Sequence, residues 1–555
     1  MEAELAIRGG TVVDGTGAPG VRADVGIAGG RVVAIDETVQ AQRVIDADGC
    51  VVAPGFIDIH THYDAQVFWD PALTPSCFHG VTTVIAGNCG FSIAPTRPSG
   101  RDIIARTLEN VEDMDVAALA EGIPWDFETF PEYLASVRQR GTCLNFGAYL
   151  GHTALRLYVM GDAAYERAAT EDEVASMVGV LRDGMAAGAV GFATSFAATH
   201  LGVDGLPIPS RFAAREEFDA LAAVLGELRC GVLAVAPGDP VGIAELYDVQ
   251  AAVGVPVTYG ALLTSPTGAH LRQVELNHQG WADGRQVWPQ VSPRPLTFSM
   301  AMSDPFTLNP NVEFSALMAQ SDDERLRAYA DPVWRRRTLA SFETQERMVP
   351  RWDTFVVGES DSHPELVGRR VQDVAAERGV HPLEVLCDLA VADGLRTRVS
   401  AVLANDDTAG VADLLQEEHC TLGLSDAGAH VGQLCDAPQA TDFLGNWVRD
   451  RQVMSIESAV RKLSGVQADL FNLTDRGYLR VGAHADVAVF DPDTVAPGPV
   501  RRVRDFPAGS ERLTADQPVG MRHVLVNGEV VVTDGAAEGA ALDTRPGAVV
   551  RPTPR

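Results

Sequence analysis

Two histidines separated by one residue, His60 and His62, are the residues of this sequence with the clearest capacity for chemistry. They follow an apolar run, residues 51–59, that predicts a buried strand. Side chains two positions apart on a strand point to the same side, so both imidazoles should lie together at the strand end. Neutral imidazoles are common metal ligands, and a converging pair therefore predicts a metal site.

Polar residues follow other short apolar runs in the same way. They are Cys89, His152, His200, Asp426 and His430. A thiolate, a carboxylate and two imidazoles suit Zn²⁺ in ligand type and number. Taken alone, Cys89 could be a buried thiol and Asp426 could be a helix N-cap. The grouping with the histidine pair is what favours a metal centre.

Short apolar runs alternate with helical patterns through the middle of the chain. Strands are predicted at 51–59, 81–87, 143–149, 188–194, 230–236, 255–262, 398–404 and 420–426, with a further candidate at 285–291. Helices are predicted at 171–187, 213–229 and 455–464. This alternation indicates an α/β fold with a parallel sheet, and about eight such units predict a (β/α)8 TIM-like barrel. The C-terminal strand ends of such a barrel carry its active site, which is where the polar residues above are placed.

Both chain ends have a different pattern, with short strands separated by glycine turns. We expect residues 1–54 and 475–555 to build one small β-sandwich together, and residues 55–474 to form the metal-dependent barrel. The stretch around 264–360 is rich in proline, tryptophan and arginine and fits no single βα unit. We expect it to be an insertion over the barrel mouth, where substrate selectivity would lie.

Charge and cysteine usage limit the partners and the compartment. The formal net charge is −31, which disfavours nucleic acid and anionic membrane surfaces as partners. The eight cysteines form no CxxC pair, and neither a signal peptide nor an apolar run of membrane-spanning length is present in the sequence. These features predict a cytoplasmic enzyme with a small-molecule substrate. The fold class is also compatible with a homo-oligomer.

Several motifs carry a family resemblance along nearly the whole chain. They are residues 9–17, 53–64, 80–84, 87–90, 151–152, 188–192, 425–427, 461–464 and 482–487. With these motifs the chain resembles the amidohydrolase superfamily, and within it the N-acyl-D-amino-acid deacylase (D-aminoacylase) group. The resemblance implies a (β/α)8 barrel with a β-sandwich made from both ends. It also implies metal-dependent hydrolysis of an amide bond.

The sequence departs from the resembled group at two positions. In D-aminoacylases the fifth and sixth strands each end in a metal-binding histidine, and by register Ala236 and Ala261 stand at those positions here. Alanine cannot ligate, which argues against a second metal. The expected cofactor is therefore one divalent metal, zinc by preference, and the expected ligands are His60, His62, Cys89 and Asp426.

The remaining assignments concern catalysis and substrate. Asp426 is expected to act as the general base toward a metal-activated water, and His152 to bind the carbonyl oxygen or a substrate carboxylate. His200, Arg294 and His430 are substrate-binding candidates. The same fold and metal site could instead hydrolyse a lactone, cyclic amide or thioester, or decarboxylate a substrate. A non-catalytic relative is a third alternative, which the two alanines favour.

Overall fold

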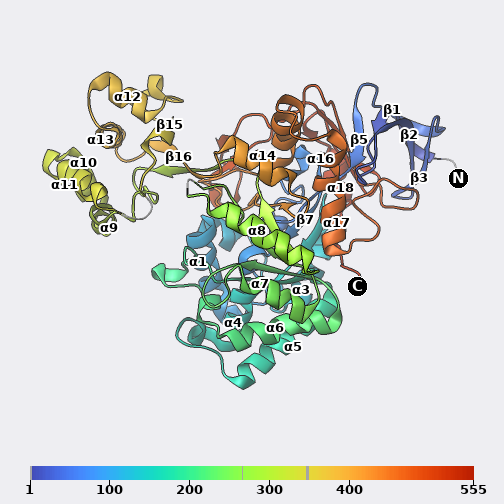
Figure 1. Cartoon of the computed structure of the whole chain (residues 1–555), viewed down its shortest axis with the longest axis horizontal. Helices are drawn as coiled ribbons and strands as arrows, with labels where there is room; N and C mark the ends of the chain where they lie inside the picture. Colours follow the sequence, from blue (N-terminus) through green and yellow to red (C-terminus); the bar gives the residue numbers. More distant parts are fainter. Residues whose placement is uncertain (1–2, 266, 346–348) are drawn as a thin grey trace. The chain divides into compact units, whose positions relative to one another are not determined.

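The computed structural model describes residues 3–265, 267–345 and 349–555. The chain forms two compact units. The first, which we call the main unit, comprises Met1–Arg294 and Asp407–Arg555, and the second, the inserted unit, comprises Pro295–Asp406. In Figure 1 the inserted unit is the yellow part of the chain, and each unit is described separately below.

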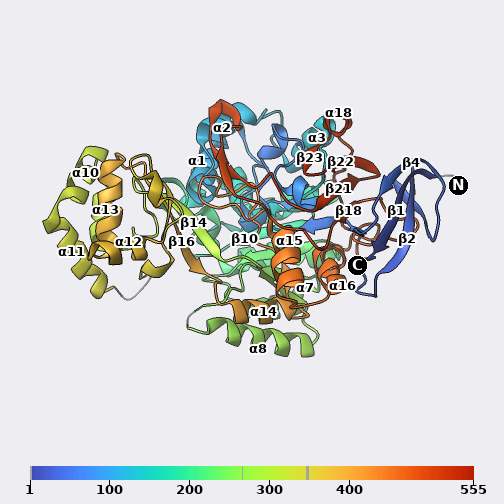
Figure 2. The same cartoon turned by 90° about the horizontal axis from the view of Figure 1, so that it is seen from above.

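The two ends of the chain build one sheet of the main unit, in the strand order β23-β22-β21-β18-β5-β1-β2-β3, with β4 paired to β1. From the N-terminal end come β1 (Ala3–Val12), β2 (Val21–Ala28), β3 (Arg31–Asp36), β4 (Ala41–Asp46) and β5 (Val51–Pro54). From the C-terminal end come β18 (Val487–Phe490), β21 (Met521–Val526), β22 (Glu529–Thr533) and β23 (Ala536–Ala537). The ends meet where β5 pairs antiparallel with β18, with Val52 opposite Val489. Figure 2 shows β1, β2 and β4 near the N-terminus, with β18, β21, β22 and β23 further toward the middle of the view.

Parallel strands form the centre of the main unit. They are β6 (Phe56–Asp58), β7 (Val81–Ala86), β8 (Asn145–Ala148), β9 (Leu150–Gly151), β10 (Gly191–Ser195), β11 (Val232–Ala236), β12 (Val257–Tyr259), β13 (Val287–Val291) and β17 (Thr421–Leu422). Neighbours pair in the orders β6-β7-β8 and β9-β10-β11-β12-β13-β17. Only Tyr149 separates β8 from β9, and a parallel bridge between Thr61 and Ala427 links the first run to the last. Apart from the half-buried Trp288 of β13, the residues of these strands are buried, as expected of strands covered on both faces.

Helices connect these strands, as the sequence pattern predicts. Those of the main unit include α1 (Arg101–Glu112), α3 (Phe130–Arg140), α4 (His152–Met160), α5 (Glu171–Ala187), α6 (Arg215–Leu228), α7 (Glu245–Val253), α8 (Ala269–Ala282), α14 (Thr408–Gln416), α16 (Ile456–Leu463) and α17 (Gly465–Phe471). A capping box between Thr170 and Glu173 begins helix α5, and Gly188, which has a positive φ, caps its C-terminal end. The predicted mixed α/β class is confirmed. None of the helices in the described ranges combines the length and apolarity that a bilayer crossing requires.

The inserted unit has its own small sheet and core. Strands β14 (Leu296–Ala301) and β15 (Val356–Glu359) both pair antiparallel with β16 (Arg398–Ala404). Helices α9 (Val312–Met318), α10 (Asp322–Ala330), α11 (Pro332–Glu343), α12 (Val371–Arg378) and α13 (Pro382–Ala392) complete it. Buried aromatic residues such as Phe314, Tyr329 and Trp334 pack together in its core.

Two details of the sequence analysis are therefore wrong. The run 398–404 is not a parallel strand, because it is the central antiparallel strand of the inserted unit, and the run 285–291 supplies the parallel strand β13 instead. The inserted unit also begins later and ends later than the expected 264–360 insertion. The reason is that α8 and β13 belong to the main unit, where β13 pairs with β12 and β17. Residues 266 and 346–348 of that expected insertion lie outside the described part.

Candidate metal centre

The two histidines lie immediately after β6, in the buried centre of the main unit. His60 and His62 are 4% and 2% exposed. Thr61 between them points to the other side and donates its hydroxyl to the Ile85 carbonyl. The backbone N–H of His62 donates to the Ala427 carbonyl. The strand alternation and these two hydrogen bonds therefore hold both imidazoles on one side, as the spacing predicts.

Cys89 and Asp426 approach the histidines from two other loops. The Cys89 sulfur lies 3.6 Å from Nε2 of His60. Asp426 Oδ1 lies 3.2 Å from Nε2 of His60 and 3.8 Å from Nε2 of His62. Ligand atoms of His60, His62 and Cys89 all lie within 4.8 Å of one another. Cys89 and Asp426 both have a positive φ, 55° and 44°, so their tight turns direct the side chains toward the histidines at a cost in backbone strain.

The electrostatics of this group favour a positive charge at its centre. Burial lowers the pKa of His60, which keeps that imidazole neutral and able to ligate. Burial also opposes charging of His62, but the carboxylates of Glu112 and Asp426 outweigh it and raise the pKa of His62 to about 9. Burial would raise the pKa of Asp426, yet His60 and His62 hold it well below its usual range. A cation bound between the Nε2 atoms and Asp426 would neutralise the nearby carboxylates as the proton on His62 does. The donor set therefore fits a divalent metal.

Two residues that the sequence analysis missed contact the outer nitrogens of the histidines. Gln290, on β13, places Oε1 2.6 Å from Nδ1 of His60. Glu112, the last residue of α1 and 2% exposed, places Oε1 3.3 Å from Nδ1 of His62. Gln290 could have been suspected as a polar residue inside an apolar run. Glu112 carries no local signal, since only the tertiary structure brings it to the histidines.

The substrate-binding candidates His200 and His430 lie near the cluster. Oε2 of Glu112 is 3.8 Å from Nε2 of His430. Nδ1 of His200 lies 2.7 Å from the Ser195 hydroxyl, at the end of β10. Burial lowers the pKa of His200 to about 3, and the nearby His430 and His62 contribute to that shift. His200 is therefore a neutral imidazole close to the histidine pair.

The structure does not bring His152 and Arg294 into the cluster. Both ring nitrogens of His152 are in buried contacts, Nδ1 with the Thr194 hydroxyl at 2.8 Å and Nε2 with Glu217 at 2.9 Å. Arg294 is paired with Asp436 at 2.6 Å and with Asp442 at 3.7 Å. Neither side chain is available to a substrate in these arrangements.

The positions expected to have lost a ligand lie at strand ends on the same sheet. Ala236 is the last residue of β11 and is 7% exposed, and Ala261 comes two residues after β12. A Cβ built on the neighbouring Gly260 would lie 3.4 Å from Cε1 of His60, so the backbone after β12 passes close to the histidine pair. Methyl groups at these two positions offer no ligand atom.

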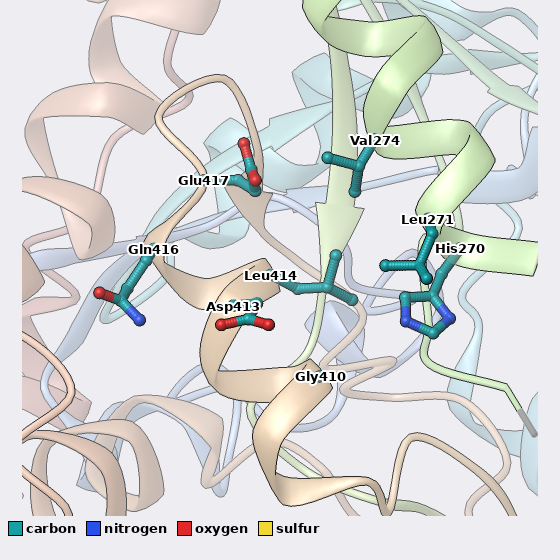
Figure 3. A pocket seen from close by; sticks show the side chains of 8 residues that line it. All are labelled: His270, Leu271, Val274, Gly410, Asp413, Leu414, Gln416 and Glu417. Atoms are coloured by element: carbon teal, nitrogen blue, oxygen red, sulfur yellow. The ribbon is translucent and has the colours of Figure 1, made fainter. Parts of the chain in front are cut away.

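A groove elsewhere on the main unit is unrelated to this cluster. It lies between α8 and α14, has a volume of about 390 Å³ and is lined by His270, Leu271, Val274, Gly410, Asp413, Leu414, Gln416 and Glu417. In Figure 3 Leu414 faces Leu271 and Val274 across it. Glu417 is engaged by Nε2 of His278 at 2.7 Å. The groove contains none of the clustered residues, and we assign it no role in catalysis.

Comparison with known proteins decides the family. The sequence profile described as the amidohydrolase family matches residues 43–532. The chain belongs to the amidohydrolase family. Its relatives include the N-acyl-D-glutamate deacylase of Alcaligenes xylosoxydans xylosoxydans, 30% identical over 99% of this chain and 96% of that protein. The D-aminoacylase of the same organism is 30% identical over 97% of this chain and 96% of its own length.

Solved structures of the family agree with these relatives. The N-acyl-D-glutamate deacylase of Bordetella bronchiseptica, complexed with zinc and a phosphonate mimic of the tetrahedral intermediate, is 28% identical. It covers 99% of this chain and 100% of its own chain with a TM-score of 0.68. A D-aminoacylase described by one-metal activation and second-metal attenuation of a binuclear centre is 27% identical, with coverage of 99% and 100% and a TM-score of 0.67. The resemblance inferred from the motifs is confirmed, as is the enzyme class, a hydrolase acting on carbon–nitrogen bonds.

Proposed function

We propose that this amidohydrolase removes the acyl group from N-acyl-D-amino acids with a single divalent metal ion, zinc by preference. The observation that carries the proposal is the convergence of His60 Nε2, His62 Nε2, the Cys89 sulfur and Asp426 Oδ1. The relatives that match nearly the whole chain are deacylases of this class. Ala236 and Ala261 support a single ion, because they stand where the resembled deacylases have metal-binding histidines, and alanine has no ligand atom.

The proposed metal centre depends on a closed barrel, which we also infer. We infer that the parallel strands close into a (β/α)8 barrel and that the sheet from both chain ends forms the β-sandwich of the family. The pairing order β6 to β17, the single-residue gap between β8 and β9 and the Thr61–Ala427 bridge support closure. On this inference the four ligands come from the ends of the first, second and last strands, which is the catalytic face of such a barrel.

The chemistry divides between the ion and the side chains. A divalent ion held by these ligands would supply Lewis acidity, which polarises an amide carbonyl and acidifies water. Oδ1 of Asp426 lies 3.2 Å and 3.8 Å from the Nε2 atoms of His60 and His62, which is where we propose that it takes a proton from water and passes it to the leaving nitrogen. Burial of the histidine pair limits competing solvent.

His200 is suited to bind the carbonyl oxygen in place of His152. The Ser195 hydroxyl oxygen accepts the Ala197 backbone N–H, so its own hydrogen is available to donate to Nδ1 of His200. That arrangement leaves the proton of a neutral His200 on Nε2, where it can be donated to an oxygen that gains negative charge in the transition state. His430, whose Nε2 lies 3.8 Å from Oε2 of Glu112, is the proposed contact for the rest of the substrate.

Turnover of N-acyl-D-amino acids by the native chain and by His60→Ala, with metal content measured on both, tests the proposal. We expect zinc-dependent hydrolysis by the native chain and loss of both metal and activity in the variant. Equal activity without metal would sink the proposal. Lactone, cyclic amide and thioester substrates belong in the same panel, because the alanines at positions 236 and 261 make the site differ from that of the resembled deacylases. Preference for one of those substrates would replace the deacylase assignment.

A further inference from the structure

The rings of His60 and His62 are oriented alike, each with one nitrogen toward Asp426 and the other toward a hydrogen-bond acceptor. In both rings Nε2 faces Oδ1 of Asp426, at 3.2 and 3.8 Å. In both rings Nδ1 faces outward, toward Gln290 in His60 and toward Glu112 in His62. A neutral imidazole ligates through the nitrogen without a proton, so a useful ligand pair needs the protons on the two outer nitrogens.

The surroundings of Gln290 determine which way its amide points. The Thr258 hydroxyl donates to the Trp288 carbonyl at 2.8 Å, so toward Gln290 it can act only as an acceptor. The Gln290 NH2 group donates to that hydroxyl at 3.2 Å. The amide oxygen is therefore the atom that faces His60, 2.6 Å from Nδ1, and it requires the proton of His60 to be on Nδ1. The lone pair of His60 is left on Nε2, beside Cys89 and Asp426.

Glu112 does the equivalent for His62 with a charged group. Nδ1 of His62 is buried and makes no hydrogen bond among the described residues, and the carboxylate oxygen facing it at 3.3 Å is Oε1 of Glu112. A carboxylate can only accept, so it favours the proton on Nδ1 and makes the ring a more basic ligand at Nε2. The other oxygen, Oε2, lies 3.8 Å from His430, so the same carboxylate links the metal side of the site to the substrate side.

We propose that Gln290 and Glu112 are positioning residues that hold His60 and His62 with their Nε2 lone pairs directed at one metal ion. This inference rests on the proposed function. In it, His60 has a neutral acceptor, Gln290, and His62 has an anionic acceptor, Glu112. Gln290 comes from β13 and Glu112 from α1, so two elements that supply no ligand still determine how the site binds metal. Loss of such acceptors in metal sites weakens metal binding about 10- to 100-fold.

Zinc affinity of the full chain, measured by competition with a chromophoric chelator, tests the inference independently of turnover. Gln290→Leu and Glu112→Leu remove each acceptor while keeping most of the side-chain volume, and we expect each to weaken zinc binding about 10- to 100-fold. Glu112→Gln retains an acceptor without the charge and should lose less than Glu112→Leu. Glu109→Gln, on the exposed side of the same helix, is the matched control and should bind zinc as the native chain does.

The outcomes separate this inference from the proposed function. Zinc binding by both leucine variants at native affinity would overturn the inference while leaving deacylation intact. A native chain that binds zinc but hydrolyses no N-acyl-D-amino acid would overturn the proposed function, while weakened zinc binding in the variants would still support the positioning role. If a leucine variant fails to fold by circular dichroism, Glu112→Asp and Gln290→Asn replace it, because each shorter side chain ends too far from Nδ1 to accept its proton. Native zinc affinity in those two would equally overturn the inference.

Discussion

Replacing Arg156 with methionine should destabilise the folded chain by about 3 kcal/mol, because it breaks a fully buried ion pair. Arg156 is 0% exposed, its partner Glu217 is 2% exposed, and Glu217 also accepts from Nε2 of His152. Removing one partner of such a pair costs about 3–5 kcal/mol, because the remaining charge stays buried. The surviving contact with His152 places the expected cost at the lower end of that range. The variant also removes the donor that Arg156 Nη2 gives to the Arg167 carbonyl at 2.7 Å.

The pH dependence of the loss identifies its cause. Burial alone would raise the pKa of Glu217, but His152 and Arg156 outweigh burial and hold it below its usual value. A carboxyl with a lowered folded pKa stabilises the fold above its unfolded pKa, and this contribution is lost as the pH falls through the folded value. Without Arg156 the carboxyl can protonate more readily. The penalty should therefore be full at pH 7 and shrink in acid, below about pH 4.5.

Urea unfolding followed by circular dichroism measures both effects. Arg182→Met is the matched control, because Arg182 pairs with Glu227 at the surface, where both side chains are more than 40% exposed. An exposed pair contributes about 0–1 kcal/mol. Equal stability of Arg156→Met and Arg182→Met would refute the reasoning, and so would a penalty that does not change with pH. Either result would reopen a catalytic role for His152, which the buried network otherwise explains.

Three further predictions concern the site and the acid stability of the fold. Asp426→Asn should lower kcat by about 10²- to 10⁴-fold, measured with zinc content in parallel, and unchanged turnover would remove Asp426 from catalysis. Dialysis against a zinc chelator should abolish hydrolysis and added Zn²⁺ should restore it; activity that persists in metal-free protein would contradict the proposal. Burial lowers the pKa of His79 from 6.5 to about 4, so the unfolded chain binds more protons in that range and stability should fall by about 3 kcal/mol as the pH drops through it. His79→Gln should reduce the dependence of the unfolding free energy on pH in this range. An unchanged dependence would show that other groups cause it.

The convergence of the four candidate ligands could be predicted because their signals are local. His60 and His62 follow an apolar strand at a spacing of two, and strand geometry alone places them on one side. Cys89 and Asp426 follow apolar runs, and a parallel sheet brings such strand ends together. These four residues converge as expected because each depends on a single strand and its first turn.

Residues whose role depends on distant partners could not be read in the same way. His152 also follows a strand, but its ring contacts Glu217, 65 residues away, and no local pattern predicts that buried network. Glu112 ends a helix and reaches His62 only through the tertiary fold. Arg294 stands in a proline-rich stretch that was expected to be an insertion over the barrel mouth, yet its guanidinium pairs with Asp436, which lies far along the chain.

The inserted unit shows a related limit. The run 398–404 has the composition of a buried strand, and composition does not distinguish parallel from antiparallel pairing. The direction of pairing is set by its partner strands, 296–301 and 356–359. Both pair antiparallel with the run and place it in a separate sheet.

Anomalous diffraction at the zinc edge from crystals of the zinc-loaded chain tests the central claim most directly. We predict one peak, bounded by Nε2 of His60, Nε2 of His62, the Cys89 sulfur and the Asp426 carboxylate. Two peaks, or a single peak away from the histidine pair, would contradict a one-metal centre built on His60 and His62.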